Sequence, residues 1–262
     1  MQIGSYARHQ EQLKEILKLE PDFVELRLDI NHTIKLSEAR RLFADAGIFC
    51  TLHLPSSPEW RPTDIAREII PYIDQGAEIE ARLVVFHGTL SSLFYSDDEI
   101  DEFINSLPLA CDAADETGMR LAIETLGTLY TELAVMFETC DVDIALDIGH
   151  GQIMANRNRA LDLLNAFPER IAMVNVHDNK GSDMIKEVAS MKKKKDVSTR
   201  DIRDLAVRYD THLPIHDGSI QYERIFSKLK EEQYDGKFLM LSNNPNDYRK
   251  EKEKFLQIWA NS

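Results

Sequence analysis

The sequence contains few cysteines and no paired cysteine motif. Cys50, Cys111 and Cys140 are its three cysteines, an odd number, and no two of them form a CxxC pair. Disulfide frameworks and thiolate zinc sites usually show paired cysteines, so both are poorly supported here. This cysteine usage favours a reducing cytoplasm.

Long apolar segments are also missing. No stretch reaches the 18 consecutive apolar residues that indicate a membrane-spanning helix, and the first ten residues, MQIGSYARHQ, lack the apolar run of a signal peptide. We therefore expect a soluble, cytoplasmic protein without a membrane partner.

Basic residues are fewer than acidic residues. Asp and Glu number 45 against 31 Lys and Arg, which gives a formal net charge of −14. Duplex DNA attracts basic surfaces, so this balance opposes a broad nucleic-acid interface. We expect a small phosphorylated or sugar substrate rather than duplex DNA. The sequence does not predict an oligomeric state.

Eight short apolar segments alternate with longer amphipathic ones. Each has the length and the β-branched composition of a buried strand. With 43% hydrophobic residues, the chain can bury a sizeable core. The eight segments are residues 1–7, 23–29, 48–55, 82–89, 120–125, 142–150, 171–178 and 237–244.

Helical patterns lie between these segments. One helix is expected over 63–79, with a bend at Pro71 because proline disrupts a helix interior. Another is expected over 96–107, where Ser96 or Asp97 can cap the N-terminus and acidic residues fill the first turn.

Eight strands, each followed by a helix or crossover, favour an α/β fold of the (β/α)8 TIM barrel class. We expect a single domain over residues 1–262. A doubly wound open sheet is the alternative, but no obvious glycine-rich phosphate turn follows the first strand. Residues 179–219 form a long insertion after the seventh strand. Its MKKKK run (191–195) indicates either a solvated helix face or a lid that collects anions.

Ligand-type side chains fall where the predicted strands end. His53, His87, His150 and His177 lie at or just past the ends of four strands, and the fifth strand ends in Glu124. In a barrel these ends converge on one face, where active sites form. The segment DTHLPIHDG (210–218) opens on the same face.

The negative charges of the two acidic residues on this predicted face require compensation. Glu124 and Asp147 would repel each other if both were buried and ionised. A divalent cation resolves this conflict, since imidazole and carboxylate together suit Zn, Mn or Fe. The pattern therefore predicts a metal site at the mouth of the barrel.

The segments TLHLP, VVFHGT, LAIET, ALDIGH, VNVHD and DTHLP…DGSIQY resemble, in order along nearly the whole chain, the xylose isomerase-like TIM barrels. This superfamily is also called AP endonuclease family 2, and the resemblance is closest to its endonuclease IV-like branch. It implies two or three divalent metal ions per chain, with zinc expected first and Mn, Fe or Co as alternatives.

The resemblance also implies the ligands. One ion would be held by His53, His87 and Glu124, and a second by Glu124, Asp147 and His177. A third would be held by His150, Asp210 and His212. The family places a ninth ligand, a glutamate, at the end of the eighth strand, where this chain has Ser242. A serine hydroxyl is a poor ligand, so the second ion should be weaker, replaced or absent.

Three functions follow from these expectations. The first is a phosphoester hydrolase resembling endonuclease IV, in which metal ions activate water and Glu124 is the catalytic residue. The alternative is a sugar or sugar phosphate isomerase or epimerase with a single metal, for which Glu25 is the candidate second carboxylate. The third is a metal-binding barrel with degenerate activity.

Four residues are candidates for contact with the substrate, and two of them also have a simpler explanation. Lys180 could hold substrate charge, and Trp60 and Arg61 could stack on a base or contact a phosphate. The favoured explanation of Trp60 is a tryptophan packed at a helix start. His216 lies near the predicted mouth but matches no family ligand, and it is interpreted as a turn residue with substrate contact possible.

Overall fold

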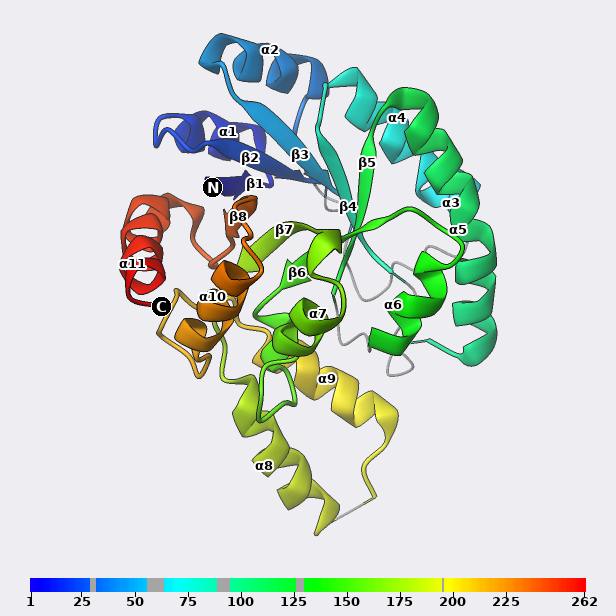
Figure 1. Cartoon of the computed structure of the whole chain (residues 1–262), viewed down its shortest axis with the longest axis vertical. Coiled ribbons are helices and arrows are strands. Elements are labelled where there is room, and N and C mark those ends of the chain that lie inside the picture. The colour runs from blue at the N-terminus through cyan, green and yellow to red at the C-terminus, as the bar shows by residue number, and fades with distance from the viewer. Residues whose placement is uncertain (29–31, 56–63, 89–94, 126–129, 195) are drawn as a thin grey trace.

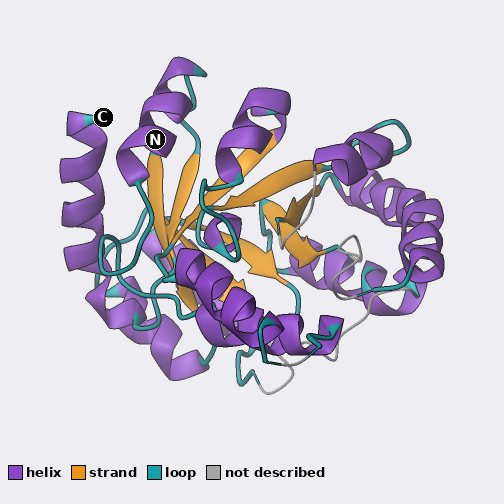
Figure 2. Ribbon diagram, turned by 90° about the horizontal axis from the view of Figure 1, so that it is seen from below, coloured by secondary structure: helices purple, strands orange, loops and turns teal. Residues whose placement is uncertain are grey.

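The structure is a computed structural model that describes residues 1–28, 32–55, 64–88, 95–125, 130–194 and 196–262. Eight parallel strands close into a barrel in chain order, so that β1 pairs with both β2 and β8. Figures 1 and 2 show helices arranged around the strands. The predicted (β/α)8 barrel is confirmed.

All eight predicted strands are present, each shorter than its apolar segment, and the last is only half as long. Their bounds are β1 Gln2–Ala7, β2 Phe23–Arg27, β3 Phe49–His53, β4 Leu83–His87, β5 Arg120–Glu124, β6 Asp143–Asp147, β7 Ile171–Val176 and β8 Lys237–Met240.

Helices follow the strands along the chain. Their bounds are α1 Gln10–Leu17, α2 Leu36–Ala46, α3 Ile65–Glu68, α4 Ile70–Glu78, α5 Asp97–Thr117, α6 Tyr130–Phe137, α7 Ala160–Ala166, α8 Gly181–Lys192, α9 Thr199–Tyr209, α10 Tyr222–Glu231 and α11 Tyr248–Asn261.

Two helices differ from the sequence expectation. The helix expected over 63–79 is divided into α3 and α4 at Ile69, and Pro71 lies in the first turn of α4, where it costs no helical hydrogen bond. α5 begins at the predicted cap, Ser96, but continues past Pro108 to Thr117. Burial of side chains such as Ala110 against the barrel outweighs the hydrogen bond that Pro108 removes.

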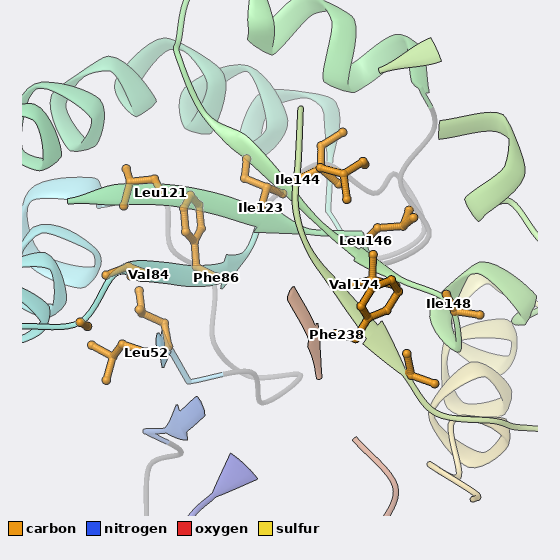
Figure 3. Close-up of a cluster of buried hydrophobic side chains, with 14 of the residues drawn as sticks. Leu52, Val84, Phe86, Leu121, Ile123, Ile144, Leu146, Ile148, Val174 and Phe238 are labelled. Atoms are coloured by element: carbon orange, nitrogen blue, oxygen red, sulfur yellow. The ribbon is translucent and has the colours of Figure 1, made fainter. Parts of the chain in front are cut away.

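The core has two layers because successive strand residues point to opposite faces. One layer includes Phe23, Val85 and Met173 and forms a buried cluster of alternating strand residues. The larger layer lies between strands and helices, and Figure 3 shows part of it, with Leu146 and Val174 packed on the outer face of the sheet.

The 179–219 insertion contains two helices, α8 and α9, which project from the barrel (Figure 1). They pack on each other through a small apolar cluster that includes Met184, Val188 and Leu205. Among the described residues, no helix combines the length and the apolar character needed to cross a membrane.

The outer core layer should dominate stability. Leu146→Ala removes a fully buried side chain from this layer and should lower the free energy of unfolding by about 2–5 kcal/mol. Leu109→Ala is the control, because Leu109 on α5 is 53% exposed and should change it little. Urea denaturation followed by circular dichroism measures both. Equal midpoints for the two variants would contradict this assignment of the core.

Candidate metal centre

Four of the predicted ligands are the last residues of their strands. His53 ends β3, His87 ends β4, Glu124 ends β5 and Asp147 ends β6. Parallel pairing sets His87 beside Glu124 in register. The strand ends therefore bring these side chains to one face of the barrel, as the sequence predicted.

The first group of side chains comprises His53, His87 and Glu124. His53 Nε2 lies 2.9 Å from Glu124 Oε2, and His87 Nε2 lies 3.0 Å from Glu124 Oε1. His53 Nδ1 lies 2.6 Å from the Leu54 carbonyl oxygen, to which it donates. Burial, with the nearby Arg27, lowers the pKa of His53 to about 4. The neutral ring therefore turns its Nε2 lone pair toward a carboxylate, an arrangement that a cation would stabilise.

The second group comprises His150, His177, Asp210 and His212. His150 Nε2 and His212 Nε2 lie 3.3 and 3.5 Å from Asp210 Oδ2. His212 Nδ1 donates to the Leu241 carbonyl at 2.8 Å, which leaves Nε2 as its free lone pair. The rings of His177 and His212 stack with centroids 3.8 Å apart.

Asp147 lies between the two groups. Its Oδ1 accepts the backbone N–H of His150 at 2.7 Å and lies 2.9 Å from His177 Nε2. His150 Nδ1 lies 3.3 Å from Glu124 Oε1 and 3.6 Å from Asp147 Oδ2. Glu124, Asp147 and His150 are thus a third set of atoms close enough to share an ion.

The carboxylates of the mouth stay ionised despite their burial. Burial raises the pKa of Glu124, but His87 and His53 outweigh it and hold that pKa well below its usual range. Burial likewise opposes the lowered pKa of Asp147, which His150 and His177 produce. Negative charge thus persists in a region of low exposure.

The donor set fits divalent cations. Within each of the three groups, one ligand atom per residue lies within 4.8 Å of the others. The buried atoms without a hydrogen-bond partner among the described residues include His150 Nδ1, His177 Nδ1 and Asp210 Oδ1 of this site, and Asn175 Oδ1 beside it. Imidazole nitrogens and carboxylate oxygens are ligands that zinc accepts. The structure therefore gathers all eight predicted ligands, although it groups His177 with His150, Asp210 and His212 rather than with Glu124.

Gly149 allows the close approach of His177. A Cβ atom at Gly149 would lie 2.0–2.4 Å from three atoms of the His177 ring. Any other residue would displace this ring. The glycine in the DIGH segment therefore has a steric role that its position before His150 did not reveal.

Arg27 and Glu25 form a buried ion pair beside the first group, and the sequence did not predict this pairing. Arg27 Nη1 donates to Glu25 Oε1 at 3.0 Å, and both residues are buried. Arg27 Nη2 also lies 3.3 Å from His53 Nε2. Burial raises the pKa of Glu25 to about 7. Arg27 therefore links Glu25 to His53 and sets a positive charge beside the first group.

Asp178 anchors the loop that supplies Asp210 and His212, a role that the sequence did not reveal. Its carboxylate accepts backbone N–H groups from Asn179, His216, Ser219 and Ile220 at 2.8–3.2 Å. Its own backbone pairs with Leu213 in an isolated antiparallel bridge. Aspartate is a common loop residue, so its type alone gave no signal.

Of the four candidate substrate contacts, the structure describes Lys180 and His216. Lys180 is exposed and precedes α8. His216 Nε2 lies 3.3 Å from Glu223 Oε1, with its ring close to Tyr222. Trp60 and Arg61 lie outside the described residues.

Ser242 lies two residues past the end of β8 and is buried, and its carbonyl accepts a hydrogen bond from the Tyr6 hydroxyl at 2.7 Å.

The xylose isomerase-like TIM barrel family matches residues 9–258. The chain belongs to this family. One relative, the uncharacterized protein MJ1311 of Methanocaldococcus jannaschii, is 26% identical over 221 residues, 78% of this chain and 67% of the relative. The predicted family is thus confirmed, whereas the endonuclease IV-like branch stays a prediction.

Solved structures share the fold across the whole chain. A D-tagatose 3-epimerase-like protein is 21% identical with a TM-score of 0.77, and the match covers 99% of this chain and 97% of that one. The IOLI protein with a binding zinc atom is 15% identical with a TM-score of 0.71, and the match covers 100% and 99%.

Removal of the Asp178 carboxylate should loosen the 210–220 loop. Asp178→Ala leaves buried N–H groups without an acceptor and should cost about 1–3 kcal/mol of stability. Hydrogen exchange should rise at residues 216–220. Asp217→Ala is the control, because this carboxylate is half exposed and pairs with Lys254 at the surface. Unchanged exchange in Asp178→Ala would show that other contacts hold the loop.

Proposed function

We propose that this chain is a metal-dependent enzyme that acts on a small sugar or sugar phosphate, and that it interconverts an aldose and a ketose. The family description and the D-tagatose 3-epimerase-like neighbour support the sugar isomerase and epimerase class. The observation that carries the choice within this class is Ser242, which stands where the family places a second acid–base glutamate. The other carboxylates near Glu124 already have partners, since Asp147 lies against His177, Asp210 lies against His150, and Glu25 accepts from Arg27.

The seven side chains of the two groups would hold the metal, and Asp147, the eighth predicted ligand, lies between them. Zinc is expected first, since a similar structure binds zinc and the donors are imidazoles and carboxylates. When bound, the metal polarises hydroxyl and carbonyl oxygens of the substrate, which makes the neighbouring C–H bond more acidic.

One carboxylate suffices for isomerisation. The proton leaves one carbon and returns to its neighbour on the same face of the substrate, so one base serves both steps. Epimerisation at one carbon removes the proton from one face and returns it to the other, which calls for a second group opposite the first. Glu124 is ionised and buried, whereas Ser242 offers only a hydroxyl. The site therefore favours isomerisation over epimerisation.

Both oxygens of Glu124 already face ring nitrogens, Oε2 that of His53 and Oε1 that of His87, which makes Glu124 a weak base. Proton transfer to Glu124 therefore depends on the acidity that the bound metal gives the substrate. The buried surroundings of Glu124 exclude water and favour this transfer.

A phosphoester hydrolase is the second candidate. The group of His150, His177, Asp210 and His212 favours it, because an isomerase with a single ion does not need these ligands. Ions in neighbouring groups could orient a phosphate and lower the pKa of a bound water. The net charge of −14 still opposes a duplex DNA substrate.

Glu124→Gln should separate catalysis from folding. The amide keeps the shape but can neither accept the proton nor bring a charged ligand to the first ion, so isomerisation should fall on the order of 10²–10⁴-fold. The assay uses aldose and ketose panels, free and phosphorylated, in deuterated water, where the wild type should introduce one deuterium per turnover or fewer. Glu231→Gln is the control, because Glu231 is 68% exposed on α10.

Other outcomes of the same assay contradict the proposal. Hydrolysis of a phosphomonoester or phosphodiester panel without isomerisation would favour the hydrolase. Metal binding without activity on either panel would indicate a degenerate barrel.

Chelation should lower both activity and stability. A metal that binds only the folded chain stabilises it by about 2.7 kcal/mol at a free concentration of 100 times its Kd. Melting temperatures of dialysed protein with and without added Zn²⁺ or Mn²⁺ measure this effect. No shift with any divalent metal would remove the basis of a metal-dependent function.

A further inference from the structure

The side-chain amide of Asn175 lies between Glu124 and Asp147. Nδ2 donates to Glu124 Oε2 at 3.0 Å and to Asp147 Oδ2 at 3.2 Å. Asn175 is fully buried on β7 and pairs in register with Asp147 on β6. An amide nitrogen carries two N–H groups, so it can serve both carboxylates at once.

We propose that this amide stands where a cation would otherwise bridge Glu124 and Asp147, so that the mouth of the barrel holds two divalent ions rather than three. The inference rests on the metal binding proposed above and specifies the number of ions. One ion belongs to His53, His87 and Glu124, and the other to His150, His177, Asp210 and His212.

The neighbouring strand offers no ligand for a bridging ion. Residues 237–242, KFLMLS, contain neither carboxylate nor imidazole. Leu239 and Leu241 are fully buried, and Leu239 is the β8 residue in register with Asn175. Ser242 is fixed through its carbonyl by the Tyr6 hydroxyl. A cation between Glu124 and Asp147 would therefore lack a charged ligand on this side.

His150 serves one of two sites. Its Nε2 faces Asp210 in the second group, and its Nδ1 faces Glu124. A neutral imidazole has one lone pair, so when Nε2 binds an ion, Nδ1 carries the proton. The protonated Nδ1 then lies 3.3 Å from Glu124 Oε1, an electrostatic contact between the two groups. It is not a ligand for a bridging ion.

Charge balance also favours two ions. The carboxylates Glu124, Asp147 and Asp210 supply three negative charges to the three groups. Two divalent ions add four positive charges and three add six, while the charge of Arg27 is already paired with Glu25. Uncompensated charge is costly where water is excluded.

Counting ions tests the proposal directly. Protein purified without chelator is loaded with Zn²⁺, dialysed and analysed by native mass spectrometry and elemental analysis. The wild type should hold two Zn²⁺ per chain. Asn175→Asp replaces the donor with a carboxylate of the same shape and should raise the count to three. Asn156→Asp is the matched control, because it makes the same charge change at an exposed residue and should leave the count at two.

Each result decides between the possibilities. Three ions or one in the wild type, or two in Asn175→Asp, would overturn the inference while metal binding itself stands. The double variant Asn175→Ala with Ser242→Glu removes the amide and supplies a carboxylate from the neighbouring strand, so it should also hold three ions and keeps the count decisive if Asn175→Asp does not fold. No ion in any of these proteins would refute the proposed metal-dependent function instead.

Discussion

The buried carboxylate of Glu124 is the group around which the mouth of the barrel is arranged. His53, His87, His150 and Asn175 all lie within 3.3 Å of its two oxygens. They come from β3, β4, the segment after β6, and β7. An ionised carboxylate at 1% exposure needs such partners, since burial without them costs several kcal/mol. A shift of one residue in the register of β3 would turn His53 to the opposite face and remove one partner. Barrel closure and Glu124 ionisation therefore depend on the same strand registers.

Much of this arrangement could be predicted from the sequence because it depends on strand ends. The apolar segments locate the strands, and the ligand residues end them, so convergence follows from parallel pairing alone. The helices were harder to predict. Pro71 and Pro108 both suggest interruption, yet one lies in a first turn and the other lies within a continuous helix. Packing on the barrel decides between these outcomes, and a local sequence pattern carries no information about that packing.

The roles of Asn175, Asp178 and Arg27 could not be predicted, because each depends on contacts between distant segments. An asparagine in an apolar strand carries no signal of its own. Its role follows from its hydrogen bonds to Asp147 on the neighbouring strand β6 and to Glu124 on β5. Ser242 was recognised as a departure from the family pattern, but the sequence could not show which group lies in the space that a larger ligand would use. Family membership specifies the barrel, whereas the strand-end residues specify its chemistry.

The two ligands of the 210–218 loop are held by different parts of the molecule. His212 is fixed to the end of β8, because its ring donates to the Leu241 carbonyl and its own carbonyl accepts from Asn243. Asp210 instead continues α9, and its backbone N–H donates to Ala206. The two side chains are therefore anchored separately, Asp210 to the projecting helix α9 and His212 to the barrel. A displacement of α9 relative to the strands would change the distance between the two proposed ligands of the second group.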